Sequence, residues 1–232
     1  MKLLAVDTCL GACSVAVVVR HGAADASAAV LAGLCERLDT GHAERLFAMI
    51  DEALRRAGCT VADCGGIAVT LGPGTFTGVR LGVAAARGLA LAAELPVWTA
   101  TSLSLVAAAA RERSPLGTGR ILAVADARNM QVHTQVFAAD GTADGAPQLL
   151  TLAAAAALVD ADVTLAGSGA AAVAGAAGEA GRTPAAVHPD IEPDARFLAT
   201  VPLIAADLPL PLYARPPDAK PQIGKSLPRV AT

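Results

Sequence analysis

The sequence contains few aromatic residues and no excess of basic charge. Only 3% of its 232 residues are aromatic, and the formal net charge is −3. Proteins that hold nucleic acid through bulk electrostatics carry a basic surface, so this composition argues against that class of function. Hydrophobic residues make up 54% of the chain, much of it alanine. No apolar run long enough to span a bilayer stands out.

Patterns for metal sites and disulfide frameworks are missing as well. The histidines are scattered, without His-x-x-x-His or His-Glu-x-x-His, so we expect no metal and no cofactor. Five cysteines are an odd number, and no basic segment precedes Asp7, which favours reduced thiols in a cytoplasmic protein without a signal peptide. No Ser-His-Asp or Cys-His arrangement supports a peptidase. The cysteines are Cys9, Cys13, Cys35, Cys59 and Cys64.

The motif that organises the chain is Leu-Gly-Pro-Gly-Thr-Phe-Thr-Gly-Val-Arg-Leu-Gly at residues 71–82. An apolar run, expected as a buried strand, precedes it, and an alanine-rich helix follows. Gly72 and Gly74 allow a sharp turn around Pro73. The loop is not a Walker A motif, because no Gly-Lys-Ser/Thr follows. It can cradle a phosphate, dock another helix or make a tight turn into the core, and local physics favours packing over phosphate binding.

Two helices of the N-terminal half present stripes that have two interpretations. The helix opening at Thr40 places apolar residues at spacings of three and four. The helix after the glycine loop has a nearly flat stripe of small residues: Gly78, Gly82, Ala86 and Ala90. Each stripe can face the protein's own sheet or a partner protein, and the sequence leaves both interpretations open.

The order β-β-β-α-β-α-β-α occurs twice. A strand ending at Asp7 pairs with a valine-rich strand at 13–20, and a strand ending at Asp126 pairs with 132–137. In each half, a later strand enters a glycine turn. We therefore predict an α/β fold of two ribonuclease H-like βββαβαβα halves that face each other, the second smaller. The predicted parts are residues 1–103, 104–207 and a proline-rich tail at 208–232. The predicted elements include a third strand at 26–31 and a last helix at 194–206.

Several motifs occur together and in order along nearly the whole chain. They are Val6-Asp7-Thr8-Cys9 with Ser14-Val15-Ala16, His42-Ala43-Glu44-Arg45-Leu46, the glycine block, Asp126-Ala127-Arg128 and Pro211-Leu212-Tyr213-Ala214-Arg215. The set resembles the TsaB family, bacterial proteins required for making N6-threonylcarbamoyladenosine (t6A) in tRNA. That family lies in the actin–hexokinase–Hsp70 superfamily, where Asp-ended hairpins hold phosphate or its magnesium and glycine loops approach the nucleoside.

The resemblance implies a non-catalytic scaffold subunit that pairs with the catalytic subunit TsaD. The ATPase TsaE acts on that pair, tRNA is reached only through the complex, and a homodimer is the alternative state of the isolated chain. TsaD carries two metal-binding histidines on its helix in this region, whereas this chain has only His42 there, with Leu46 four residues later. An ATP-dependent small-molecule kinase of the same superfamily is the second hypothesis.

Two groups of candidate residues follow from the resemblance. The expected partner interface consists of His42, Leu46, Met49, Ile50, Ala53, Gly78, Val79, Gly82, Val83 and Ala86. A vestigial nucleotide site would consist of Asp7, Thr8, Ser14, Asp126, Arg128, Gly167 and Gly169. The competing interpretation of the two aspartates is that each caps the turn after its strand, as short polar side chains often do.

Overall fold

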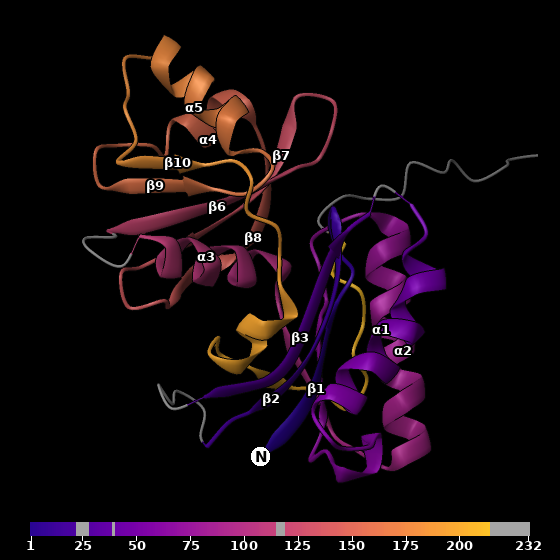
Figure 1. Ribbon diagram of the computed structural model, residues 1–232. Coiled ribbons are helices and arrows are strands. Elements are labelled where there is room, and N and C mark those ends of the chain that lie inside the picture. The colour runs from indigo at the N-terminus through magenta and orange to yellow at the C-terminus, as the bar shows by residue number, and fades with distance from the viewer. Residues whose placement is uncertain (22–27, 39, 115–118, 214–232) are drawn as a thin grey trace, which may run out of the picture.

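The computed structural model describes residues 1–21, 28–38, 40–114 and 119–213. Two mixed sheets face each other, with helices on both outer sides and one helix between them (Figure 1). The order of strands in each sheet reproduces the predicted repeat, because β5-β4-β1-β2-β3 in the first sheet matches β10-β9-β6-β7-β8 in the second. The prediction of two ribonuclease H-like halves is confirmed.

The first sheet has the strand order β11-β5-β4-β1-β2-β3. β1, β2 and β3 are antiparallel neighbours, whereas β4 lies parallel to both β1 and β5. Its strands are β1 Lys2–Asp7, β2 Ala12–Val19, β3 Ala29–Arg37, β4 Ile67–Thr70, β5 Val97–Ala100 and β11 Ile204–Ala205.

The second sheet has the order β10-β9-β6-β7-β8 and the same mixture of parallel and antiparallel pairs. Its strands are β6 Arg120–Asp126, β7 Gln131–Phe137, β8 Ala143–Thr151, β9 Val163–Ala166 and β10 Ala186–His188. α4 (Leu152–Ala156) and α5 (Ala170–Glu179) pack on its outer face through a separate apolar cluster.

On the outer face of the first sheet, α1 (His42–Arg56) and α2 (Phe76–Ala93) lie side by side (Figure 1). The 3-10 turn η1 (Val61–Asp63) connects α1 to β4 and contacts α2. The apolar stripe of α1 turns inward and joins one core cluster with β1, β2, β4 and the alanines of α2. α2 is long and apolar enough to cross a membrane by length and composition, but seven of its residues are buried, so it serves as a core helix.

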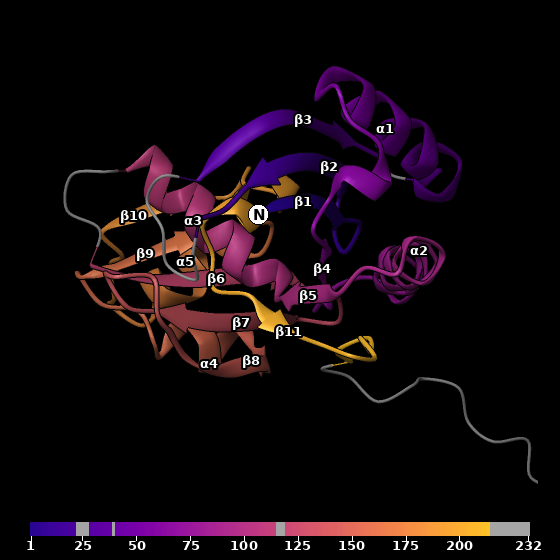
Figure 2. The same cartoon turned by 90° about the horizontal axis from the view of Figure 1, so that it is seen from below.

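Between the sheets lies α3 (Ser102–Arg113), which follows β5 and packs on β6 and β7 (Figure 2). The 3-10 turn η2 (Ala195–Ala199) covers the inner face of the first sheet beside α3. α3 follows the strands of the first sheet but contacts the second, and η2 follows the strands of the second sheet but contacts the first. Each half thus contributes one segment that packs on the other. The division into residues 1–103 and 104–207 stays a prediction.

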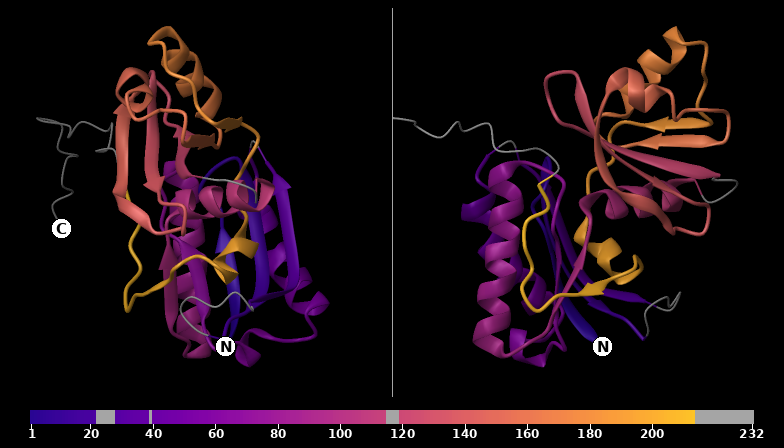
Figure 3. Two further views of the ribbon diagram at one scale, coloured as in Figure 1. Left: turned by 90° about the vertical axis from the view of Figure 1, so that its left-hand side faces the viewer. Right: turned by 180° about the vertical axis from the view of Figure 1, so that it is seen from behind.

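Two sequence-based expectations about element boundaries were wrong. The helix expected at 194–206 is only the short turn η2, since Pro202 follows closely and Ile204–Ala205 instead pairs with β5 as β11. The third strand expected at 26–31 runs over Ala29–Arg37. After β11 the chain runs along the α2 side of the molecule (Figure 3), where Leu212 N donates to Leu71 O at 2.7 Å. The predicted tail beyond residue 213 lies outside the described residues.

Candidate functional site

The glycine loop closes directly onto the turn that follows β1. Thr75 caps α2, its Oγ1 accepting from Gly78 N at 3.1 Å, and Thr75 N donates to Cys9 O at 2.7 Å. Thr8 Oγ1 donates to Gly78 O at 2.6 Å. The loop and the turn are therefore held together by hydrogen bonds from both sides, which leaves no open space between them.

The small residues of this region serve the same close contact. A Cβ atom at Gly74 would lie 2.1 Å from Cys9 O, and one at Gly78 would lie 2.1 Å from Thr8 O. At Gly82 it would lie 2.7 Å from Thr8 Oγ1. Gly78 and Gly82 of the α2 stripe thus pack against the protein's own turn, while Ala86 and Ala90 join the core cluster under α1.

Asp7, the last residue of β1, is fully buried. Its Oδ2 accepts from Thr70 Oγ1, and its Oδ1 accepts from Cys9 N at 3.3 Å. The Cys9 thiol lies 3.1 Å from the Thr70 hydroxyl. Burial raises the pKa of Asp7 from 3.8 to about 6, because desolvation outweighs the hydrogen bonds from Thr70 and Cys9. A carboxyl group in this position stabilises a turn and is not accessible to a phosphate.

The equivalent aspartate of the second half caps its turn in the same manner but is exposed. Asp126 Oδ1 accepts from Arg128 N at 3.0 Å, two residues on, as Asp7 does from Cys9. Arg128 is also exposed and has a φ of 63°. Gly167 and Gly169 pack on β6, since Cβ atoms there would lie 2.3 Å from Val124 O and 2.6 Å from Val124 Cγ1.

Apolar side chains occupy part of the region where the two halves meet. Cys9 and Leu10 from the first turn join Val79, Leu103 and residues of β6 and β9 in one buried cluster. Asp7, Thr8 and Ser14 are at most 1% exposed, and Ser14 Oγ accepts from Ala195 N at 2.9 Å. Three residues of the expected vestigial nucleotide site are therefore enclosed, whereas Asp126 and Arg128 are exposed, and the site stays a prediction.

Most residues of the expected partner interface lie in the core of the chain, and the interface itself stays a prediction. Of the ten residues, only His42 is partly exposed, at the start of α1. The other nine are buried against the protein's own sheet or turn, because a helix on an open sheet needs its apolar stripe for the core. These nine are Leu46, Met49, Ile50, Ala53, Gly78, Val79, Gly82, Val83 and Ala86.

Large apolar residues nevertheless lie on the outer side of these helices. Phe47 on α1 is 55% exposed, and Phe76 and Leu91 on α2 are 53% and 83% exposed. Arg80 lies over the Phe76 ring at 3.6 Å, and its Nε donates to Tyr213 Oη at 2.6 Å. The sequence contained a signal for these residues, because aromatic residues are scarce in it and Phe47 does not share the spacing of the buried α1 stripe.

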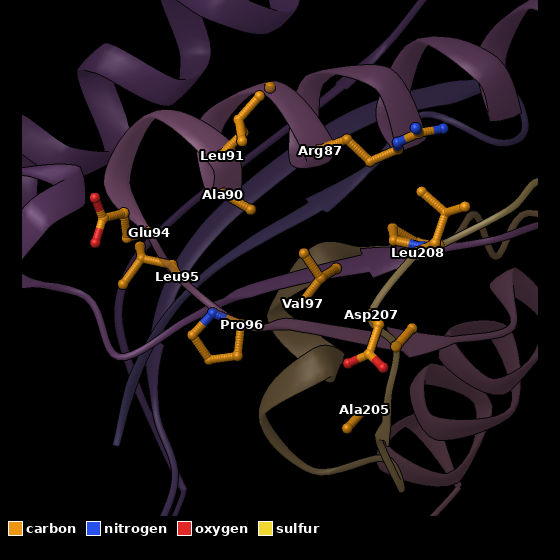
Figure 4. A pocket seen from close by; sticks show the side chains of 13 residues that line it. Arg87, Ala90, Leu91, Glu94, Leu95, Pro96, Val97, Ala205, Asp207 and Leu208 are labelled. Atoms are coloured by element: carbon orange, nitrogen blue, oxygen red, sulfur yellow. The ribbon is translucent and has the colours of Figure 1, made fainter.

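A pocket of about 630 Å³ continues this surface at the far end of α2 (Figure 4). Its walls are the last turns of α2, with Leu91 and Glu94, and the segment after β11, with Asp207 and Leu208. Leu208 is 58% exposed. Within the described ranges, no group of three or more His, Cys, Asp or Glu residues has the arrangement of a metal site.

Comparisons with known proteins agree on one family. The family model for TsaD, tRNA N6-adenosine threonylcarbamoyltransferase, matches residues 36–177. The tRNA threonylcarbamoyladenosine biosynthesis protein TsaB of Escherichia coli is 37% identical over 60% of this chain and 56% of its own length. An uncharacterized protein of Mycobacterium tuberculosis is 34% identical over 94% of both chains.

Among solved structures, YeaZ from Pseudomonas aeruginosa superposes with a TM-score of 0.73 at 30% identity, covering 91% of this chain and 99% of that one. Against the curated TsaB proteins of E. coli and Haemophilus influenzae, the alignment spans about half of each relative's length, 56% and 52%.

Proposed function

This chain belongs to the TsaB branch of the TsaD-like family, and from that membership we propose that it is a non-catalytic scaffold subunit in t6A biosynthesis. It binds a TsaD-like catalytic subunit and holds it in its working state. The complex acts in the cytoplasm, a TsaE-like ATPase acts on the pair, and tRNA is reached through the complex.

The enclosure of Asp7 is the observation that carries the non-catalytic role. Phosphoryl transfer needs positioned groups that contact the phosphate or its metal ion. Here the aspartate of the first hairpin is fully buried, and the turn that follows it contributes Cys9 and Leu10 to an apolar cluster with the second half. The same enclosure counts against the alternative hypothesis of an ATP-dependent small-molecule kinase, and a nucleotide-binding assay with the isolated chain separates the two.

We place the partner interface on the outer side of α1 and α2. Its contact residues are the exposed Phe47, Phe76 and Leu91, with Arg80 and Tyr213 at the start of α2. Aromatic and arginine side chains are enriched among residues that dominate binding energy. A homodimer of the isolated chain through the same surface is the competing occupant.

Co-purification with the TsaD-like subunit, followed by reconstitution of tRNA modification, tests this proposal. Phe47→Asp and Leu91→Asp introduce charges into the surface, and we expect each to weaken the heterodimer at least tenfold with little change in melting temperature. Leu158→Asp, at an exposed leucine beyond α4 in the second half, is the matched control. Wild-type affinity in both helix variants would move the interface elsewhere, and ATP turnover by purified protein would favour the kinase.

A further inference from the structure

Two of the five cysteines flank the turn η1 in the connection between α1 and β4, pack on the same core cluster and are close enough to influence each other. α1 ends at Arg56, Gly58 follows with a φ of 64°, and the chain then forms the turn η1. Thr60 and Asp63 make a capping box around this turn: the Asp63 carboxylate accepts from both Thr60 N and Thr60 Oγ1 at 2.8 Å. Residues that directly flank such a box on either side tend to contact each other. Here they are Cys59 and Cys64.

The two thiols differ in exposure but share one environment. Cys64 is 5% exposed and Cys59 is partly exposed, and both pack on the core cluster under α1. The Cys64 thiol donates to Thr60 O at 3.7 Å. Burial and the adjacent Cys59 side chain raise the pKa of Cys64 to about 11, with Lys2 partly offsetting them. Cys64 is thus a protected thiol, whereas Cys59 is reachable from solvent.

The other three cysteines lack this arrangement. Cys9 and Cys13 are at most 1% exposed inside the core, and Cys35 is exposed on the edge strand β3. An exposed thiol without a neighbour forms mixed or intermolecular disulfides, whereas a paired one can be resolved within the chain.

We propose that Cys59 and Cys64 form a reversible redox site, which closes to an intramolecular disulfide by exchange with a low-molecular-weight disulfide. The Cys59 thiolate attacks one sulfur of the reagent and releases one thiolate, which leaves a mixed disulfide on Cys59. Cys64, after giving its proton to solvent, attacks the Cys59 sulfur and releases the second thiolate. The protein loses two electrons and two protons, and the reagent is reduced to two thiols.

Oxidised glutathione is the probe, and the full chain carrying Cys35→Ser removes the exposed competitor. We expect the native protein to lose two free thiols and the mass of two hydrogens, with a Cys59–Cys64 cross-linked peptide that dithiothreitol reverses. Adding Cys64→Ala should stop the reaction at one glutathione on Cys59. Adding Cys59→Ser should abolish uptake, and it provides a second variant if Cys64→Ala folds poorly.

Three results would overturn the proposal. The first is stable glutathione on Cys59 while Cys64 is present, because the pair would then not resolve. The second is no reaction at Cys59 in folded protein. The third is a cross-link to another cysteine. Melting curves recorded before and after treatment establish that the native state reacted.

Discussion

Replacing Asp7 by asparagine tests whether this buried carboxyl group serves only to accept the hydrogen bonds from Cys9 and Thr70. Asparagine has the same shape and keeps an oxygen to accept from Cys9 N, at 3.3 Å in the native protein. Its amide group replaces Oδ2, which accepts from the Thr70 hydroxyl, so that hydroxyl must turn to accept instead. The substitution removes the charge while leaving the volume of the site unchanged.

The expected magnitude follows from the pKa of Asp7, which burial raises from 3.8 to about 6. A raised carboxyl pKa means that the native state binds more protons than the unfolded state within this window. The Asp7 contribution to the free energy of unfolding therefore falls as pH rises from about 4 to about 6, and stays low above that. A rise of this size corresponds to about 3 kcal/mol.

Urea unfolding at pH 4 and pH 7.5 measures the effect as the stability of Asp7→Asn minus that of the native protein. We expect this difference to shift in favour of asparagine by about 2 kcal/mol between the two pH values, because the unfolded-state carboxyl is already partly ionised at pH 4. Rearranging the Thr70 hydrogen bond costs about 0.5–1.5 kcal/mol at both pH values. This cost therefore cancels in the change of the stability difference between pH 4 and pH 7.5. Asp126→Asn alters the equivalent exposed turn carboxylate and serves as the control.

A difference that does not change with pH would refute the burial argument. A variant that folds but no longer supports tRNA modification with its partners would return Asp7 to a role in binding phosphate or metal. The proposed function expects modification to persist, because Asp7 is not reachable from the surface.

Two further predictions concern the helices. Gly78→Ala should destabilise the fold by about 3 kcal/mol, the upper end of overpacking, because its Cβ meets backbone Thr8 O at 2.1 Å. Gly88→Ala in the same helix has open space and should gain about 0.5–1 kcal/mol, so similar urea midpoints would contradict the packing. Met49→Ala should lower stability by about 2–5 kcal/mol, since Met49 is 1% exposed in the core. Its partner affinity, measured on folded protein, should be unchanged; a loss there would restore Met49 to the interface.

The repeat and its topology could be predicted because they depend on local patterns. Strands ending at Asp7 and Asp126, each followed by a β-branched strand, predict two hairpins, and the sheet orders match. The segment after η2 could not be predicted in this way. Ile204–Ala205 pairs with β5, about a hundred residues earlier, and nothing in a two-residue strand identifies its partner.

The sequence could not show whether each helical stripe faces the protein's own core or a partner, and the reason is physical. A stripe of glycine and alanine allows close approach by any backbone, whether a partner helix or the chain's own turn. For α2 the approaching backbone is Thr8, which precedes Gly78 by seventy residues. For α1 the stripe with the regular spacing is the core, so the residues left for a partner are those out of spacing, such as Phe47.

The burial of Asp7 likewise depends on distant parts of the chain. Thr70 of β4 donates to the Asp7 carboxylate, the glycine loop bonds to the next turn at Cys9, and Cys9 and Leu10 of that turn pack with Leu103 and Ile121. Most of these contacts come from residues outside the β1–β2 hairpin. Asp126 keeps the same turn hydrogen bond without such a cover and stays exposed. The two aspartates thus share a motif and differ in accessibility, so the motif alone does not indicate nucleotide binding. A phosphate can bind such a carboxylate only where the carboxylate is accessible, and Asp7 is fully buried.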